Sequence, residues 1–137
     1  MKITAITPYF YEVPLAVPIS DARNTITMRS CVLLRVETDE GVTGWGEAAS
    51  FAGCGELVAG VIKFFEAKLV GQDPSMISRI YDDAYHGSQH FGRRGLVICA
   101  LSGIDIALWD ILGKVAGLPL HKILGASRES IDFYFNG

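Results

Sequence analysis

The sequence of 137 residues has few cysteines, little excess charge and no long uncharged run. Its three cysteines, Cys31, Cys54 and Cys99, are odd in number and far apart, which argues against a disulfide framework and favours the cytoplasm. Twelve Lys and Arg against fifteen Asp and Glu leave no basic excess, so no nucleic acid partner is expected. The longest stretch without a charged residue, Gly95 to Ile104, has ten residues, about half of a membrane span, so no membrane partner is expected either.

The composition instead favours a single compact domain. Half of the residues are hydrophobic, and the mean hydropathy of +0.30 is high for so short a soluble chain. A closed eight-stranded α/β barrel needs about 250 residues and will not fit. The apolar surplus must therefore be buried against protein.

The first part of the chain predicts a three-stranded antiparallel meander. Residues Met1–Val13 are rich in β-branched and aromatic types and predict a strand that Pro8 makes irregular. Residues Pro14–Met28 carry two prolines and no clear periodicity, which predicts a long loop. Alternating residues in Cys31–Thr38, a turn, and Val42–Ala49 then predict a hairpin whose glycines allow close approach of a helix.

Helical spacing of apolar residues then predicts three helices, which end near Gly71, Gly87 and Gly117. The second is expected to open at Asp73, an N-cap that proline follows. The third is the longest, over about Leu96–Ala116, and a short turn follows it. The predicted inward faces are Leu57, Val61, Phe64, Phe65 and Lys68 in the first helix, Ile77, Ile80, Tyr81 and Ala84 in the second, and Val97, Leu101, Ile104, Leu108, Ile111 and Val115 in the third.

Polar residues alone do not identify a reaction. His86 and His90 have the spacing of a helical metal pair, but no carboxylate or cysteine completes a shell, so a surface loop is favoured over a zinc site. The segment Gly53–Gly55 precedes a helix and either holds an anion or only caps the helix. Neither a nucleophile elbow nor a carboxylate cluster for a divalent metal is present.

The charged residues on and just before the longest helix are also interpreted from their positions. Arg93 and Arg94 stand before its N-terminus, where the dipole disfavours cations, so they either pair with an acidic surface or face solvent. Asp105 lies on the apolar stripe and is either buried and paired or faces a partner. Asp110 precedes Lys114 by four residues and is expected to form an ion pair.

Two long motifs carry a family resemblance. They are VETDEGVTGWGEA at Val36–Ala48 and ALSGIDIALWDILGKVAGLPL at Ala100–Leu120. Together they resemble the N-terminal capping domain of the mandelate racemase and muconate lactonizing enzyme group of the enolase superfamily. The segment Gln72–Pro74 and the helix start at Gly95 fit the same pattern, and the combination resembles the acid-sugar members, which include sugar-acid dehydratases and galactarolactone cycloisomerase.

The resemblance implies an α+β cap, with a three-stranded antiparallel meander followed by a helical bundle, over residues 1–127. Residues 128–137 would begin a modified (β/α)₇β barrel whose first strand is Ile131–Gly137. In this family a Lys or His base removes the proton α to a carboxylate while Mg²⁺ stabilises the enediolate. Those groups lie on later barrel strands, so this chain is assigned no catalytic base and no metal ligand and is expected to be inactive alone.

The resemblance also implies that two cap loops, Val17–Thr27 and Ser50–Gly55, contact the substrate. A cation would pair with a carboxylate, amide and hydroxyl groups would bind sugar hydroxyls, and apolar groups would exclude water. A residue at the end of the first barrel strand would face the barrel mouth. In this prediction Arg23 is the cation, Asn24 and Thr25 bind sugar hydroxyls, and Phe51 and Cys54 exclude water. Asn136 is the predicted substrate-binding residue at the end of the barrel strand.

The functional hypothesis is a capping portion of an Mg²⁺-dependent sugar-acid dehydratase. A cycloisomerase or racemase of the same superfamily is the first alternative, and a non-catalytic assembly module is the second. The expected partners are a small carboxylate or sugar-acid substrate, the protein's own barrel and further copies of the chain. If a barrel normally covers this cap, Trp109 and Phe133 should be more exposed than their residue types warrant.

Overall fold

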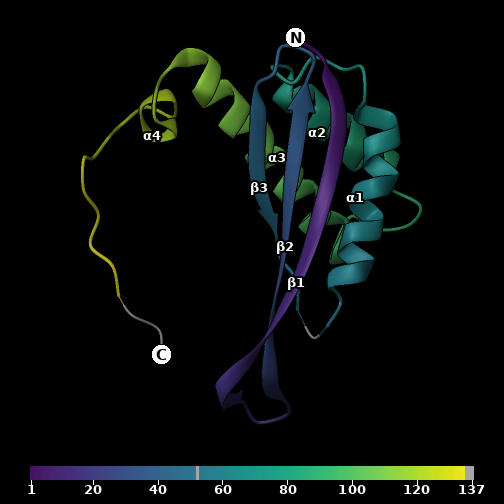
Figure 1. The fold of residues 1–137 in the computed structure, drawn as a ribbon, viewed down its shortest axis with the longest axis vertical. Helices are drawn as coiled ribbons and strands as arrows, with labels where there is room; N and C mark the ends of the chain where they lie inside the picture. The colour runs from purple at the N-terminus through teal and green to yellow at the C-terminus, as the bar shows by residue number, and fades with distance from the viewer. Residues whose placement is uncertain (52, 135–137) are drawn as a thin grey trace.

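The computed structural model describes residues 1–51 and 53–134. Three antiparallel strands form one sheet in the order β1-β2-β3, and helices cover one of its faces (Figure 1). This arrangement confirms the predicted meander followed by helices. The elements are β1 Ile3–Ser20, β2 Thr25–Thr38, β3 Thr43–Ala48, α1 Gly55–Leu69, α2 Ile77–Gly87, α3 Leu96–Ala116 and α4 Leu120–Ile123.

The core lies between the sheet and helices α1, α2 and α3. Side chains alternate along β2, so that every second residue from Val32 to Val36 is completely buried against the helices. The opposite face carries Arg35 and Trp45, which are partly exposed. The helices supply most of the remaining core: Val58, Ile62, Phe65 and Leu69 from α1, Ile77, Ile80 and Ala84 from α2, and Val97, Leu101, Ile104, Leu108 and Ile111 from α3.

Glycines on β3 let helix α3 approach the sheet closely. A Cβ atom added to Gly44 would lie 2.1 Å from the carbonyl oxygen of Ala107, and one added to Gly46 would lie 2.0 Å from that of Gly103. Both distances are far inside van der Waals contact, and both neighbours are backbone atoms. The expectation that these glycines allow close approach of a helix is confirmed.

Side chains of helix α1 form hydrogen bonds with the backbone at the free edge of β1. The backbone N–H of Ile6 donates to the Glu66 carboxylate at 2.9 Å, and the Lys63 ammonium donates to the Ile6 carbonyl at 3.1 Å. Lys63 and Glu66 also pair with each other at 2.8 Å. Unpaired backbone groups on an edge strand can form hydrogen bonds with a strand of another chain. Here both backbone groups of Ile6 on that edge are already bonded to α1.

Helix α3 does the same for the free edge of β3. The backbone N–H of Trp45 donates to Asp110 at 2.8 Å, and Lys114 donates to the carbonyl of Thr43 at 2.7 Å. Lys114 also pairs with Asp110 at 2.6 Å, which confirms the expected ion pair. Both outer strands are therefore fastened to a helix by one acid and one lysine.

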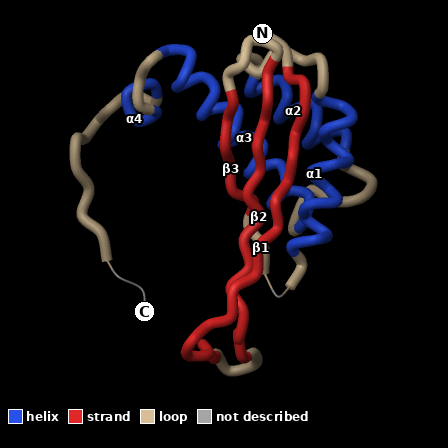
Figure 2. Tube along the Cα trace, in the orientation of Figure 1, coloured by secondary structure: helices blue, strands red, loops and turns tan. Residues whose placement is uncertain are grey.

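The predicted loop over Pro14–Met28 is wrong. β1 continues to Ser20 and β2 begins at Thr25, so the region is a two-stranded ribbon that projects beyond the helices (Figure 2). A ribbon with no helix behind it buries no face, and its sequence therefore lacks the alternation that identifies a strand. The prolines are tolerated because β1 is an edge strand, and the register shifts between Pro14 and Ile19.

Helix α1 turns a different face to the core than predicted. Its buried residues include Phe65, but Leu57 is 60% exposed and Phe64 is 44% exposed. Helix α2 also starts later than predicted, at Ile77, because Asp73 accepts the amide of Ser75 and forms a separate turn. The predicted inward residues of α2 are confirmed, because Ile77, Ile80 and Ala84 are buried and Tyr81 is partly buried against the core.

Helix α3 follows the prediction in its bounds and ends at a left-handed Gly117. Most of its predicted stripe is buried, although Val115 is exposed. Its 21 residues and mean hydropathy of 1.9 give it the length and composition of a membrane span, which the short uncharged run did not indicate. Half of the 18-residue window that has this hydropathy is buried in the structure.

The segment after α4 runs apart from the sheet and the helices (Figure 1). Ile131 is 80% exposed and Phe133 is 88% exposed. The strand predicted over Ile131–Gly137 is absent from residues 131–134, which have no neighbouring strand to bond with, and residues 135–137 lie outside the described chain. The predicted exposure of Phe133 is confirmed, whereas Trp109 is half-buried and packs against the core.

Candidate functional site

Residues 14–29, which we call the arm, carry polar side chains at their tip. The Asp21 carboxylate accepts hydrogen bonds from the backbone amides of Arg23 and Asn24, both at 2.7 Å. These two bonds lower the pKa of Asp21. Across the ribbon the hydroxyls of Ser20 and Thr25 lie 3.0 Å apart. The tip is therefore a closed turn, with its backbone held by its own side chain.

Three predicted substrate-binding residues, Arg23, Asn24 and Thr25, lie at this tip, and all three are exposed. Within the described part of the chain Arg23 forms no ion pair, so its guanidinium is available to an anion. The Thr25 hydroxyl is already hydrogen-bonded to the Ser20 hydroxyl, and a ligand would bond to it in addition to Ser20.

A second group of predicted residues lies in the turn before α1. The Cys54 thiol accepts the amide of Phe51 at 3.4 Å, and the amide of Cys54 donates to the carbonyl of Phe51 at 3.0 Å. The Phe51 ring is 70% exposed. Cys54 thus organises the turn, and Phe51 is the group that the turn presents.

Serine residues tie this turn to the base of the arm. The Ser50 hydroxyl donates to the Ser30 hydroxyl at 2.7 Å, and the Ser30 hydroxyl lies 3.3 Å from the carbonyl of Ser50. A hollow of about 220 Å³ opens beside this contact. Its lining residues are Ile26, Met28, Arg29, Ser30, Glu47, Ala49, Ser50 and Phe51.

Cys31 lies next to this hollow on β2. Burial raises the pKa of its thiol, and a hydrogen bond and the negative charge of Glu47 act in the same direction. The thiol is therefore held in its neutral form, and such a cysteine is a poor nucleophile. This hollow supports binding rather than covalent catalysis by Cys31.

The structure brings the predicted residues together in two groups rather than one. Arg23 and its neighbours are at the tip, whereas Phe51 and Cys54 are at the base. Ser30 lies five residues beyond Thr25 along β2, which is about 17 Å at the usual rise per strand residue. The sixth predicted residue, Asn136, lies outside the described residues.

Sequence reasoning missed most residues that line the hollow. Arg29 and Glu47 place opposite charges beside the exposed side chains of Ile26 and Met28. The arm buries no face, so no burial pattern marked Thr25–Ser30 as a strand, and these residues were assigned to a loop. Within the described residues Arg29 forms no ion pair, so it offers a second free cation.

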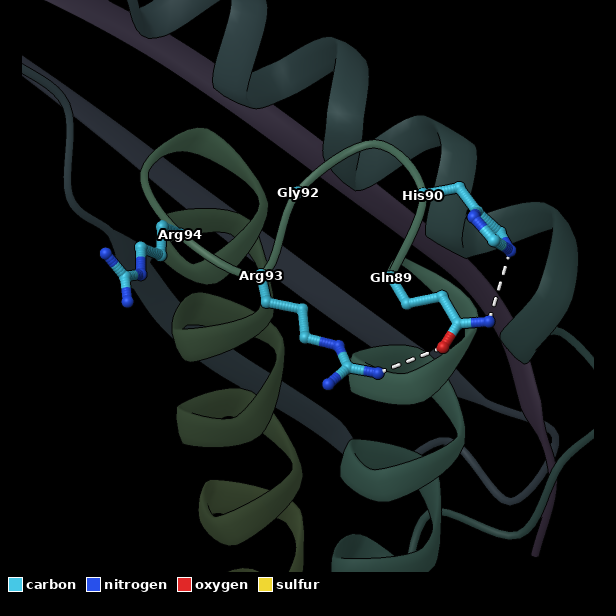
Figure 3. A pocket seen from close by; sticks show the side chains of 5 residues that line it. All are labelled: Gln89, His90, Gly92, Arg93 and Arg94. Carbon is cyan, nitrogen blue, oxygen red and sulfur yellow. Dashed lines mark hydrogen bonds between the residues drawn. The ribbon is translucent and has the colours of Figure 1, made fainter.

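Another hollow, of about 610 Å³, lies between α2 and α3 and is lined by Gln89, His90, Gly92, Arg93 and Arg94 (Figure 3). Arg93 points toward Gln89 and donates to its side chain at 3.1 Å, whereas Arg94 points away. Arg93 also stacks over the ring of Tyr85, with 5.0 Å to the ring centroid. The two guanidinium groups do not converge, so they do not form a joint anion site.

The described residues do not contain the donors for a metal. No three His, Cys, Asp or Glu side chains in residues 1–51 and 53–134 cluster as a metal ion requires. His86 instead bonds through its ring to the carbonyl of Asp82 at 2.9 Å, and His90 bonds to Gln89 at 3.1 Å. This donor set does not fit Mg²⁺.

A family model described as "Mandelate racemase / muconate lactonizing enzyme, N-terminal domain" matches residues 4–125. The chain belongs to this family. Its three strands and following helices are the fold of that N-terminal domain, as the sequence motifs indicated.

The chain is also similar in sequence to two named enzymes. The chain is 40% identical to D-galactarolactone cycloisomerase of Agrobacterium fabrum, over all of this chain and 36% of the relative. It is 36% identical to L-talarate/galactarate dehydratase of Salmonella typhimurium, over 88% of this chain and 32% of the relative. The chain therefore spans about a third of the length of these relatives.

Solved structures of the same family agree in fold. The Salmonella typhimurium dehydratase, crystallised with Mg and L-lyxarohydroxamate, superposes with a TM-score of 0.86 at 34% identity. The match covers 95% of this chain and 35% of that one. The chain thus corresponds to the N-terminal domain of these longer relatives.

Proposed function

We propose that this chain is the substrate-capping part of an Mg²⁺-dependent enolase-superfamily enzyme that acts on a sugar acid, with dehydration as the reaction. The observation that carries the proposal is the arm, a ribbon that projects beyond the helices and ends in free polar groups (Figure 2). No packing within the described residues requires this projection. A ribbon that reaches past its own domain is suited to cover a site on a neighbouring domain.

The groups at both ends of the arm match the chemistry of a sugar acid. Arg23 at the tip or Arg29 at the base would pair with the carboxylate of the substrate. The Asn24 amide and the Thr25 hydroxyl would bond to sugar hydroxyls. Phe51 would cover the reacting carbons and exclude water.

The reaction proposed is loss of water from a hydroxy acid. A base removes the proton on the carbon next to the carboxylate, the β hydroxyl leaves with a proton as water, and the enol that remains becomes a keto acid. No described residue of this chain is placed to act as that base, and the donors present do not fit Mg²⁺. The contribution of this chain is to bind, to orient and to exclude water.

We propose that residues 1–127 form the cap and that residues 128–137 lead into a barrel domain. The exposed Ile131, Phe133 and Tyr134 support this because such side chains are normally covered. We also propose a cytoplasmic location, where the three cysteines, all free in the structure, would stay reduced. The chain alone is expected to be inactive.

A chimaera tests the capping function. The chain would replace the N-terminal domain of the Salmonella typhimurium dehydratase, whose corresponding domain superposes with a TM-score of 0.86. We expect Mg²⁺-dependent turnover of one or more sugar acids by the chimaera and none by the chain alone. A chimaera that folds, as judged by circular dichroism, but accepts no acid sugar from a broad panel would contradict the proposal.

Variants of the arm then test the residues. We expect Arg23→Ala to lower kcat/KM by about 10- to 100-fold, the effect of one lost charged hydrogen bond, and Phe51→Ala to lower kcat more than it raises KM. Arg79→Ala, a change at an exposed position of α2 outside the arm, is the matched control. If Arg23→Ala and Arg29→Ala both behave as this control, the arm does not bind the carboxylate.

Cycloisomerisation is a second candidate because of the relative from Agrobacterium fabrum, which matches the whole chain at 40% identity. The two reactions share removal of the α proton and differ in the fate of the intermediate. A second chimaera on the barrel of that cycloisomerase measures whether the cap prefers the substrates of either enzyme. Higher kcat/KM with the cycloisomerase barrel would favour this alternative.

A further inference from the structure

Helix α1 carries apolar residues on two opposite sides. One side is buried in the core through residues such as Ile62 and Phe65. The other side exposes Leu57 and Phe64, and Phe64 contacts Phe91 edge to face at 5.3 Å between ring centroids. Leu57 and Phe64 belong to a groove of about 340 Å³ whose lining residues are Glu56, Leu57, Gly60, Val61, Phe64 and Phe91.

Gly60 lies at the centre of this groove. It is exposed in the middle of the helix, and a Cβ atom added there would meet nothing within 4 Å. Glycine in a helix interior costs about 1 kcal/mol relative to alanine. No contact within the described chain explains the absence of a side chain at Gly60, whereas close approach of another helix would explain it.

The residues around Gly60 are arranged symmetrically. On one flank of the exposed helix face, Leu57 lies three residues before Gly60 and Phe64 lies four residues after it. On the other flank, Glu56 lies four residues before Gly60 and Lys63 lies three residues after it. A half-turn about an axis through Gly60 reverses the helix. It then sets Phe64 opposite Leu57 of the copy and Lys63 opposite Glu56 of the copy.

We propose that α1 pairs with α1 of a second copy of this chain, antiparallel, with Gly60 at the crossing point. The aromatic and aliphatic side chains would meet on one flank. The acid and the lysine would form two equivalent ion pairs on the other flank. The surface is self-complementary in both shape and charge, as a two-fold interface requires.

The ion pair at this interface is compatible with the contacts that Lys63 already makes. Its ammonium donates to Glu66 at 2.8 Å and to the carbonyl of Ile6 at 3.1 Å, which leaves one of three N–H groups free. Glu56 is exposed and forms no ion pair among the described residues. Both partners therefore have a site left for the second copy.

Sedimentation equilibrium of the 137-residue chain tests the proposal. We expect a monomer–dimer equilibrium, weakened at least about ten-fold by Gly60→Gln. The monomer accommodates this change because the space around Gly60 is open, and the helix gains stability, so a loss of dimer is not a loss of fold. A chain that stays monomeric up to about 1 mM, or a dimer that Gly60→Gln leaves intact, would overturn the proposal.

Charge exchange gives a second test of the same pairing. Glu56→Lys should weaken the dimer, and the double variant with Glu56→Lys and Lys63→Glu should restore it, because the ion pairs re-form with reversed sign. Lys63→Glu also disturbs the edge of β1, so thermal unfolding is recorded for each variant. Glu129→Lys, an equal change of charge elsewhere, is the control. A double variant that dimerises no better than Glu56→Lys would contradict the antiparallel register.

Discussion

The carboxylate of Glu66 accepts the backbone N–H of Ile6 at 2.9 Å, which fastens the outer edge of β1 to helix α1. Asp110 repeats this relationship with Trp45 on the outer edge of β3, at 2.8 Å. A small three-stranded sheet has two free edges, and here each receives one carboxylate at a backbone amide. This arrangement holds the helices in place on the sheet and makes each edge less available to another strand.

Glu66 should make stability depend on pH. Burial tends to raise its pKa, but hydrogen bonds from Lys63 and the Ile6 amide outweigh it, and the pKa is lower than usual. A lowered pKa contributes stability above the unfolded value of about 4.3, and this contribution is lost as pH falls through the folded value. We therefore expect Glu66→Gln to lower the free energy of unfolding by about 1–3 kcal/mol near neutral pH.

Urea unfolding at neutral and acidic pH measures this effect. The difference between Glu66→Gln and wild type should shrink once the wild-type carboxylate is protonated. Glu129→Gln, at an exposed position, should behave as wild type at both pH values. A difference for Glu66→Gln that does not change with pH would show that the charge is not the source of the stability.

Asp110→Ala should open the edge of β3. The change removes the acceptor for the Trp45 amide and the partner of Lys114. We expect faster hydrogen exchange at the Trp45 amide, measured by NMR, and a loss of about 1–2 kcal/mol in the free energy of unfolding. Asp110→Asn retains an acceptor, so its exchange rate and its free energy of unfolding should lie between those of wild type and Asp110→Ala. Unchanged exchange at Trp45 in Asp110→Ala would mean that the edge is protected in another way.

The parts of the fold that bury a face could be predicted from the sequence. The strand Cys31–Thr38 alternates, and helix α3 has a continuous apolar stripe, because each faces the core on one side only. Helix α1 was predicted with the wrong inward face because it is apolar on two sides, so spacing alone did not distinguish Phe65 from Phe64.

The arm and its hollow could not be predicted in the same way. The strands of the arm pair through backbone hydrogen bonds and bury no face, so the side chains of Ile26 and Met28 carry no signal of burial. Arg23 was expected in a loop, whereas the structure places it in the turn at the end of a ribbon. The separation between the tip and Phe51 follows from strand geometry, which the loop assignment did not supply.

Gly46→Ala should destabilise the protein strongly. The new Cβ atom would lie 2.0 Å from the carbonyl oxygen of Gly103, a backbone atom of α3 that cannot move without the helix. We expect a loss of about 3 kcal/mol or more in thermal or urea unfolding, at the upper end of overpacking. Gly87→Ala is the matched control, because a Cβ atom there meets nothing within 4 Å, and it should be neutral or stabilising. Equal stability of the two variants would mean that α3 can shift away from β3.

Asp105 should affect stability in the opposite direction to Glu66. Burial among Ile104, Leu108 and their neighbours raises its pKa, and a hydrogen bond from Trp109 only partly offsets this. A raised pKa means that folding disfavours the charged carboxylate, so the cost is absent below the unfolded pKa of about 3.9 and appears as pH rises through the folded value.

Asp105→Asn removes that charge and retains an acceptor for Trp109. We expect it to increase the free energy of unfolding by up to about 1 kcal/mol near neutral pH and to have little effect in acid. Urea unfolding of Asp105→Asn and Asp110→Asn at neutral and acidic pH distinguishes the effects of the two carboxylates of α3. At neutral pH, Asp110→Asn should destabilise the protein, whereas Asp105→Asn should stabilise it. If Asp105→Asn destabilises instead, the Asp105 charge must be paired, and burial would not be its dominant influence.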